Sequence, residues 1–179
     1  MEMDSDQKLI ERALGGEDRA LERVIQRHYS SVYRLAFRWC RNREDAEDIA
    51  QEVFVKMTGN LTSFQHRSAF STWLCRITIN TAKDFNRKRA TREQYENEFI
   101  SKGPSKNPVP SPETAIHSHQ VYALLDRLPH KQKAAILLVF AEGLRHGEAA
   151  KVLQCSEATV SWRIFQGRKK LKQWMKKAG

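Results

Sequence analysis

Residues 144–175 read LRHGEAAKVLQCSEATVSWRIFQGRKKLKQWM and decide the fold of the C-terminal part of the chain. Apolar residues recur there at near-helical spacing, which predicts a short amphipathic helix followed by a longer one. The connection Gln154–Ser156 between them is tight, and Ser156 is placed to cap the second helix. Such a pair forms a helix-turn-helix, whose second helix can enter the major groove of DNA. The side chains expected to be buried are Leu144, Ala149, Ala150, Leu153, Ala158, Val160, Ile164 and Leu171.

The second helix is basic and carries no acid beyond its first turn. Its cations from residue 163 onward are Arg163, Arg168, Lys169, Lys170, Lys172, Lys176 and Lys177. Residues 116–179 hold 12 basic and 4 acidic groups, so they carry +8 of the net charge of +10. A solvated basic tail is the alternative, but a helix of one sign in this motif favours contact with phosphates.

The composition excludes several classes of protein. No apolar run approaches the length of a membrane span, and the N-terminus MEMDSDQK lacks the apolar segment of a signal peptide, so we expect a cytoplasmic protein. The three cysteines lack metal-ligand spacing, and the six histidines form no convincing ligand set. We therefore expect reduced structural thiols, no metal, no cofactor and no small-molecule substrate.

The rest of the chain is predicted to be all-α, as two small helical domains joined by a flexible linker. Helices are expected at 9–14, 21–40, 44–57, from Ser68 or Ser71 to about 89, at 116–128 and at 129–142. Gly15 and Gly16 should stop the first helix, and Asn42 should cap the third. The side chains expected to be buried on the third helix, on the fourth helix and on the helix at 129–142 are Ala46, Ile49, Ala50, Val53, Met57, Phe70, Trp73 or Leu74, Ile77, Thr81, Phe85, Ala134, Ile136, Leu137, Leu138 and Phe140. Residues 101–112 read SKGPSKNPVPSP and hold four of the five prolines, which is typical of a linker. The predicted boundaries are 1–92 for the first domain, 93–114 for the linker and 115–179 for the second domain.

Two faces of the first domain look functional. Along the third helix, Asp45, Asp48 and Glu52 follow helical spacing, with Gln51 beside them. This acidic strip in a basic protein would repel DNA, so it predicts a dock for a basic surface of another protein, unless it is merely a solvated face.

The fourth helix has the opposite character. Its polar face is made by Arg76, Asn80, Lys83 and Arg87, where the asparagine can pair with a base edge and the cations can hold phosphates. The preceding loop offers Phe64, Gln65, His66 and Arg67, a mixture that suits an unstacked single-stranded base. Trp39 and Trp73 lie on apolar stripes and are expected in the core.

Four segments in order resemble the sigma-70 family of bacterial transcription initiation factors, and the small extracytoplasmic-function (ECF) group in particular. They are DAEDIAQEVFVKM (45–57), SAFSTWLCRITINTAKDFNRKR (68–89), LDRLPHKQKAAILLVFAEGL (125–144) and CSEATVSWRIFQGRKKL (155–171). The proline-rich gap lies where that family has its linker.

The resemblance implies a function and partners. Such factors bind core RNA polymerase through the β′ clamp helices and the β flap, direct it to promoter DNA, and are usually held by an anti-sigma protein, membrane-bound or soluble. The acidic strip would then dock on the clamp helices. The helix with Asn80 and Lys83 would read the −10 element, and the 61–68 loop would capture a flipped base. The −35 element would be read by Ser156, Thr159, Ser161, Trp162, Arg163, Phe165, Gln166, Arg168 and Lys169.

Some residues depart from the family pattern, and other functions remain open. Gly147 weakens the first helix of the motif, Trp162 is large for its position, and Asp84 adds an acid beside the −10 face. An ordinary helix-turn-helix repressor or activator that acts without polymerase is the first alternative. A nucleic-acid-processing enzyme is the second, but it would need carboxylates or a metal set near the basic face, and the acids lie elsewhere.

Overall fold

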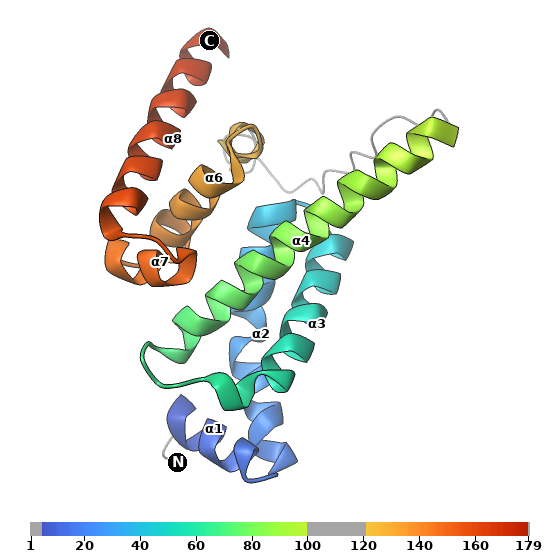
Figure 1. The fold of residues 1–179 in the computed structure, drawn as a ribbon, viewed down its shortest axis with the longest axis vertical. Helices are drawn as coiled ribbons and strands as arrows, with labels where there is room; N and C mark the ends of the chain where they lie inside the picture. Colours follow the sequence, from blue (N-terminus) through green and yellow to red (C-terminus); the bar gives the residue numbers. More distant parts are fainter. Residues whose placement is uncertain (1–4, 100–120, 179) are drawn as a thin grey trace, which may run out of the picture. The chain divides into compact units, whose positions relative to one another are not determined.

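The computed structural model describes residues 5–99 and 121–178, which are helical and contain no strand within those ranges. The chain divides into two compact units, residues 1–95 and 96–179, and each is described by itself (Figure 1). The all-α, two-domain prediction is confirmed. Residues 100–114 of the predicted linker, residue 115, and residues 116–120 of the expected helix 116–128 lie outside the described residues.

The first unit contains α1 (Asp6–Leu14), α2 (Asp18–Cys40), α3 (Arg43–Gly59), the short 3-10 helix η1 (Leu61–Ser63) and α4 (Phe70–Phe99). Local signals set the boundaries as predicted. The side chain of Asn42 accepts a hydrogen bond from the Asp45 amide and caps α3, and Gly15 and Gly16 end α1. The predicted stripe of α3 is fully buried, and Trp39 and Trp73 are buried, with 1% and 7% of their surface exposed.

The fourth helix differs from the prediction in two ways. It continues to Phe99, ten residues beyond Arg89, because residues 90–99 are good helix formers without glycine or proline. Its buried side is also rotated: Thr78, Ile79 and Ala82 are buried, whereas Ile77 and Phe85, expected in the core, are half-buried. The rotation leaves Ile77 free to line a surface hollow.

An ion cluster joins the start of α1 to α2. Asp6 accepts a hydrogen bond from Arg27 at 2.8 Å, and its other oxygen lies 3.0 Å from Nε2 of the buried His28. The His28 ring in turn lies edge-on to Phe70 of α4, with ring centroids 5.2 Å apart. Burial alone would raise the pKa of the Asp6 carboxyl, but the Arg27 and His28 contacts outweigh it, so this pKa lies below its ordinary value.

The second unit contains a helical segment at 121–126, α6 (His130–Ile136), the π-helical segment η2 (Leu137–Ala141), α7 (His146–Leu153) and α8 (Glu157–Ala178). Gly143 has φ +69° and the Leu144 amide bonds to the Leu138 carbonyl at 3.0 Å, so the helix ends there as predicted. Its core includes Leu128, Ala134, Leu137, Leu138, Ala149, Val152, Val160 and Ile164.

Phe140 and Ala158, both expected in this core, are exposed, and Leu144, Leu153 and Leu171 are only half-buried. Phe140 is 61% exposed, because the wider π turn, closed by a bond from the Glu142 amide to the Leu137 carbonyl, carries it away from the core. Ala158 is exposed and Leu153 only half-buried, since Val160 and Val152 take the inward positions.

Candidate functional site

The acidic strip on α3 is divided by ion pairs. Asp45 accepts a hydrogen bond from Arg89 of α4 at 2.6 Å, and Glu52 pairs with Lys56 at 2.8 Å. Asp48 and Gln51 are exposed between them. Asp48 is therefore the strongly exposed acid of the strip, and ion pairs partly neutralise the charges of Asp45 and Glu52 on either side of it. The negative electrostatic field of the strip is weaker than its three carboxylates alone would produce.

An apolar surface accompanies this strip, and the sequence interpretation missed it. Val55, one turn after Gln51 on α3, is 70% exposed. Tyr29 of α2 is partly exposed and stacks on Tyr33 at 6.4 Å and on Phe54 at 6.0 Å. The spacing of Tyr29 and Tyr33, four residues apart on one helix, was the available signal. Together with Asp48, these side chains suit a protein partner better than a nucleic acid.

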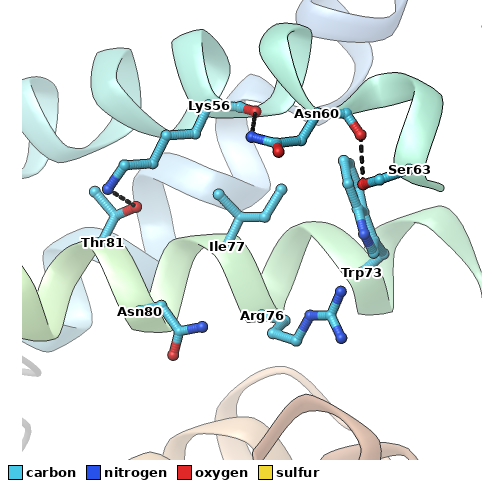
Figure 2. Close-up of a pocket in the computed structure, with 8 residues that line it drawn as sticks. All are labelled: Lys56, Asn60, Ser63, Trp73, Arg76, Ile77, Asn80 and Thr81. Atoms are coloured by element: carbon cyan, nitrogen blue, oxygen red, sulfur yellow. Dashed lines mark hydrogen bonds between the residues drawn. The ribbon is translucent and has the colours of Figure 1, made fainter.

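A hollow of about 220 Å³ opens between the end of α3, η1 and α4 (Figure 2). Hydrogen bonds fix its wall: Lys56 Nζ donates to Thr81 at 3.2 Å, Asn60 donates to the Lys56 carbonyl at 2.8 Å, and Ser63 donates to the Asn60 carbonyl at 2.7 Å. Ile77 and Trp73 supply its apolar surface, and Arg76 and Asn80 its polar one. The hollow thus combines an apolar floor with hydrogen-bonding groups at its side.

The predicted polar face of α4 is present on the surface. Asn80 and Arg87 are exposed, and Arg76 and Lys83 are half-buried. Arg87 pairs with Asp84 at 3.2 Å, so the acid noted beside this face lowers its net charge. The two residues of the face that line the hollow are Arg76 and Asn80.

Phe64 requires a correction. The loop ring expected to be available for stacking on a base is only 8% exposed, because it packs on Phe70 at 5.3 Å and on Trp73 at 5.4 Å. Burial among aromatic rings is the stronger preference for a phenylalanine next to two of them. The other loop residues, Gln65, His66 and Arg67, are exposed, and His66 has φ +52° and lies against Phe64.

The helix-turn-helix forms as predicted. Gln154 adopts a left-handed conformation (φ +50°) at the end of α7, and the hydroxyl of Ser156 accepts from the Thr159 amide at 3.2 Å at the start of α8. The Ser156 and Thr159 hydroxyls also bond to each other at 2.8 Å. Both predicted DNA contacts therefore serve the cap in this structure.

The other residues predicted to contact the −35 element fall into two groups, those exposed on α8 and those that contact other parts of the protein. Ser161, Trp162, Phe165, Arg168 and Lys169 are exposed on α8 and Gln166 is half-buried. Arg163 points back to the turn and donates to the Cys155 sulfur at 3.4 Å, and the Arg168 guanidinium lies 5.9 Å from the Phe140 ring centre. A further contact, His146 Nδ1 to Ser161 Oγ at 2.8 Å, ties α7 to the exposed side of α8 and was not foreseen.

Two features are absent from residues 5–99 and 121–178. No group of three or more His, Cys, Asp and Glu side chains in this part of the chain is placed to hold a metal ion. Among the same residues, no helix is long and apolar enough to cross a membrane.

The family models and the relatives that match this chain all describe sigma factors. The family model described as Sigma-70 region 2 matches residues 24–92, and the one described as Sigma-70, region 4 matches residues 118–171. The RNA polymerase sigma-H factor of Pseudomonas aeruginosa is 33% identical over 92% of this chain and 91% of its own length. The ECF RNA polymerase sigma-E factor of Escherichia coli is 32% identical over 92% of this chain and 91% of its own.

Solved structures share the fold. The structure of CnrH in complex with the cytosolic domain of CnrY matches with a TM-score of 0.73 and 25% identity, over 98% of this chain and 100% of that one. The sigma factor RpoE of Bartonella quintana, solved with the anti-sigma factor NepR, matches with a TM-score of 0.70 and 22% identity, over 87% of this chain and 96% of that one.

Proposed function

This chain belongs to the sigma-70 family and is an ECF-type RNA polymerase sigma factor, and we propose that its surfaces divide promoter recognition as follows. Residues 1–92 act as region 2, 93–114 as the linker and 115–179 as region 4. The protein binds core RNA polymerase, directs it to promoters through −10 and −35 elements, and leaves all catalysis to the polymerase.

Core polymerase docks on α3. Asp48 supplies the exposed charge, Gln51 lies beside it, and Asp45 and Glu52 exchange their internal partners Arg89 and Lys56 for basic groups of the β′ clamp helices. The exposed Val55 adds an apolar contact at the C-terminal end of this surface. Region 4 makes the second contact with polymerase, on the β flap.

The hollow beside α4 is the observation that carries the proposal. A repressor that reads duplex DNA has no need for a preformed recess next to its basic face, whereas a factor that opens DNA needs a place for an unstacked base. Asn80 and Arg76 line the recess and can bond to a base edge, and Trp73 and Ile77 offer apolar surface to its ring. Lys83 and Arg87 then hold phosphates of the same strand, while Gln65, His66 and Arg67 border the site.

Region 4 reads the −35 element with the outer side of α8, and an anti-sigma protein holds the free factor until a signal releases it. Control of this kind is supported by the ECF relatives and by the solved neighbours that carry an anti-sigma partner. We place the protein in the bacterial cytoplasm, tethered to the inner membrane where the anti-sigma partner is a membrane protein.

Run-off transcription tests the proposal. The protein and core RNA polymerase are combined on DNA from upstream of its own gene, with each component alone as control. A discrete transcript that needs both components is the expected result. Tight, specific binding to that DNA by the protein alone, with no transcript from any template of a promoter library, would instead indicate an ordinary repressor.

A further inference from the structure

The outer side of α8 changes character along its length. Ala158, Ser161, Trp162 and Phe165 follow i, i+3, i+4 and i+7 on one side, and all four are exposed. Trp162 is 58% and Phe165 62% exposed, although large aromatic side chains usually avoid water. Further along the same side come Arg168, Lys169 and Lys172. The N-terminal half is therefore apolar and the C-terminal half cationic.

The groups in the N-terminal half that could bond to a base are already engaged. The Ser161 hydroxyl donates to the Glu157 carbonyl at 3.1 Å, so its contact with His146 uses the hydroxyl as acceptor. The Ser156 and Thr159 hydroxyls bond to each other within the cap. Among the described residues, the Gln166 side-chain amide has no hydrogen-bond partner, which leaves it as the polar group available for direct readout.

The two arginines of α8 both lie against the protein. Arg163 donates to the Cys155 sulfur on the turn side of the helix, and the Arg168 guanidinium is drawn to the face of Phe140, itself exposed by the π turn. An arginine that reads guanine must instead point along the groove with both nitrogens free. Arg163 is engaged at the turn, and Arg168 lies in the cationic C-terminal half of the surface, beyond the aromatic pair.

We propose that this protein reads its upstream promoter element through A·T pairs: Phe165 and Trp162 contact thymine methyl groups, and Gln166 bonds to adenine. The N-terminal residues of a recognition helix meet base edges, apolar side chains match the thymine methyl, and glutamine pairs with the N6 and N7 of adenine. The cations that follow hold the phosphates. This inference rests on the proposed function, because it assigns the DNA that region 4 of a sigma factor binds.

The charge of α8 favours DNA over a protein as the occupant of this surface. After Glu157 the helix has no acid, and Arg168, Lys169 and Lys172 border the exposed aromatic rings. A polyanion with apolar methyl groups in its groove complements both halves of the surface at once.

The test starts from a promoter library with a randomised upstream element, from which full-length protein and core polymerase select active templates. Selected elements are expected to be A·T pairs at the positions α8 contacts. Each thymine is then replaced by deoxyuridine, which removes the methyl group alone. Holoenzyme affinity is expected to fall about fourfold per contacted methyl, equivalent to about 0.8 kcal/mol.

Three variants make the assignment specific. Holoenzyme with Phe165→Ala should bind the selected promoter more weakly than wild type. Its affinity should not change when at least one of the thymines is replaced by deoxyuridine. Met175→Ala, which removes an equally exposed side chain farther along α8, should keep the full sensitivity. Gln166→Arg should change the preferred base pair at one position of the upstream element from A·T to G·C, since arginine pairs with the O6 and N7 of guanine.

Different failures have different meanings. A required G·C pair in the selected elements, or unchanged deoxyuridine sensitivity in Phe165→Ala, would overturn this inference and leave the sigma factor assignment intact. The second result, combined with lost binding of the anti-sigma partner, would assign the aromatic surface to that protein. If no template yields a transcript with wild-type protein, the proposed function fails and this inference with it.

Discussion

Gly167 of α8 lies so close to Ile136 of α6 that a Cβ atom on the glycine would sit 2.7 Å from the Ile136 Cδ1. The approach is between two packed helices, with Leu128 and Gln132 on either side at 3.6 Å. A side chain at this position would therefore require Ile136 to shift, and glycine permits the close α6–α8 approach without that movement. The glycine allows α8, which carries the proposed −35 contacts, to lie close to its supporting helix.

Gly167→Ala is expected to destabilise the second unit, because the overpacking cost of about 1–3 kcal/mol at the α6–α8 contact exceeds the gain in helix propensity of up to about 1 kcal/mol. Gly147→Ala is the matched control: its Cβ would meet only the flexible end of Glu157 at 3.4 Å. That change should stabilise by up to about 1 kcal/mol through helix propensity. Urea unfolding of both variants measures the difference, and equal stability of the two would contradict the close packing.

Asp48→Arg should weaken core polymerase binding at least about tenfold, since it places a cation where the proposed interface has its exposed acid. The melting temperature should not change, because Asp48 is exposed on α3. Glu22→Arg makes the same charge change on the exposed side of α2 and should bind polymerase normally. Equal affinities of the two variants in a competition assay would move the docking surface away from α3.

Asn80→Ala should reduce discrimination at one position of the −10 element by about 1–3 kcal/mol while polymerase binding persists. Arg87→Ala, on the same helix face, should weaken all promoters alike and lower the salt dependence, because it removes a phosphate contact. The measurement is open-complex formation on promoters with single −10 substitutions. A uniform loss for Asn80→Ala would refute a base-reading role.

Phe64→Ala should destabilise the first unit by about 3–5 kcal/mol, the usual cost of deleting a buried phenylalanine side chain. Gln65→Ala, the exposed neighbour in the same loop, should change stability by less than about 0.5 kcal/mol. Chemical unfolding distinguishes the two. Wild-type stability in Phe64→Ala would return this ring to the surface and to the set of candidate base contacts.

Asp6→Asn should cost about 1 kcal/mol at neutral pH by removing the charge that Arg27 and His28 surround. The lowered pKa of Asp6 in the folded protein means that its contribution is fully present well above 3.8, the ordinary value for the group, and is lost as the pH falls through the folded value. Unfolding at pH 7 and near pH 3 should therefore show a smaller difference between variant and wild type at the acidic pH. A constant difference would exclude this linkage.

Much of the fold could be predicted from local patterns. The cap by Asn42, the glycine stop at 143 and the Gln154–Ser156 turn depend on residues that are neighbours in the chain, so short-range chemistry was sufficient. The polar face of α4 and the exposed position of Asp48 followed from helical spacing for the same reason.

The predictions that were wrong concern side chains whose surroundings come from distant segments. Phe64 was predicted to be an exposed loop residue, but it packs against Phe70 and Trp73. Phe140 was predicted to be buried, but the π turn at residues 137–141 places it on the surface. The engagement of Asp45 by Arg89, 44 residues away, could not be read from either helix alone.

The sequence by itself therefore determined that this chain is a pair of helical units with a basic helix-turn-helix and an acidic strip on one helix, because periodicity, caps and charge are properties of contiguous residues. Only the tertiary structure decided which polar groups remain available. The Ser161 hydroxyl and Arg163 are hydrogen-bonded and Arg168 lies near the Phe140 ring, whereas the Gln166 amide has no hydrogen-bond partner among the described residues; these differences depend on contacts made by other helices or by the turn. Hydrogen bonding and burial are pairwise properties in space, and helical spacing along the chain does not contain them.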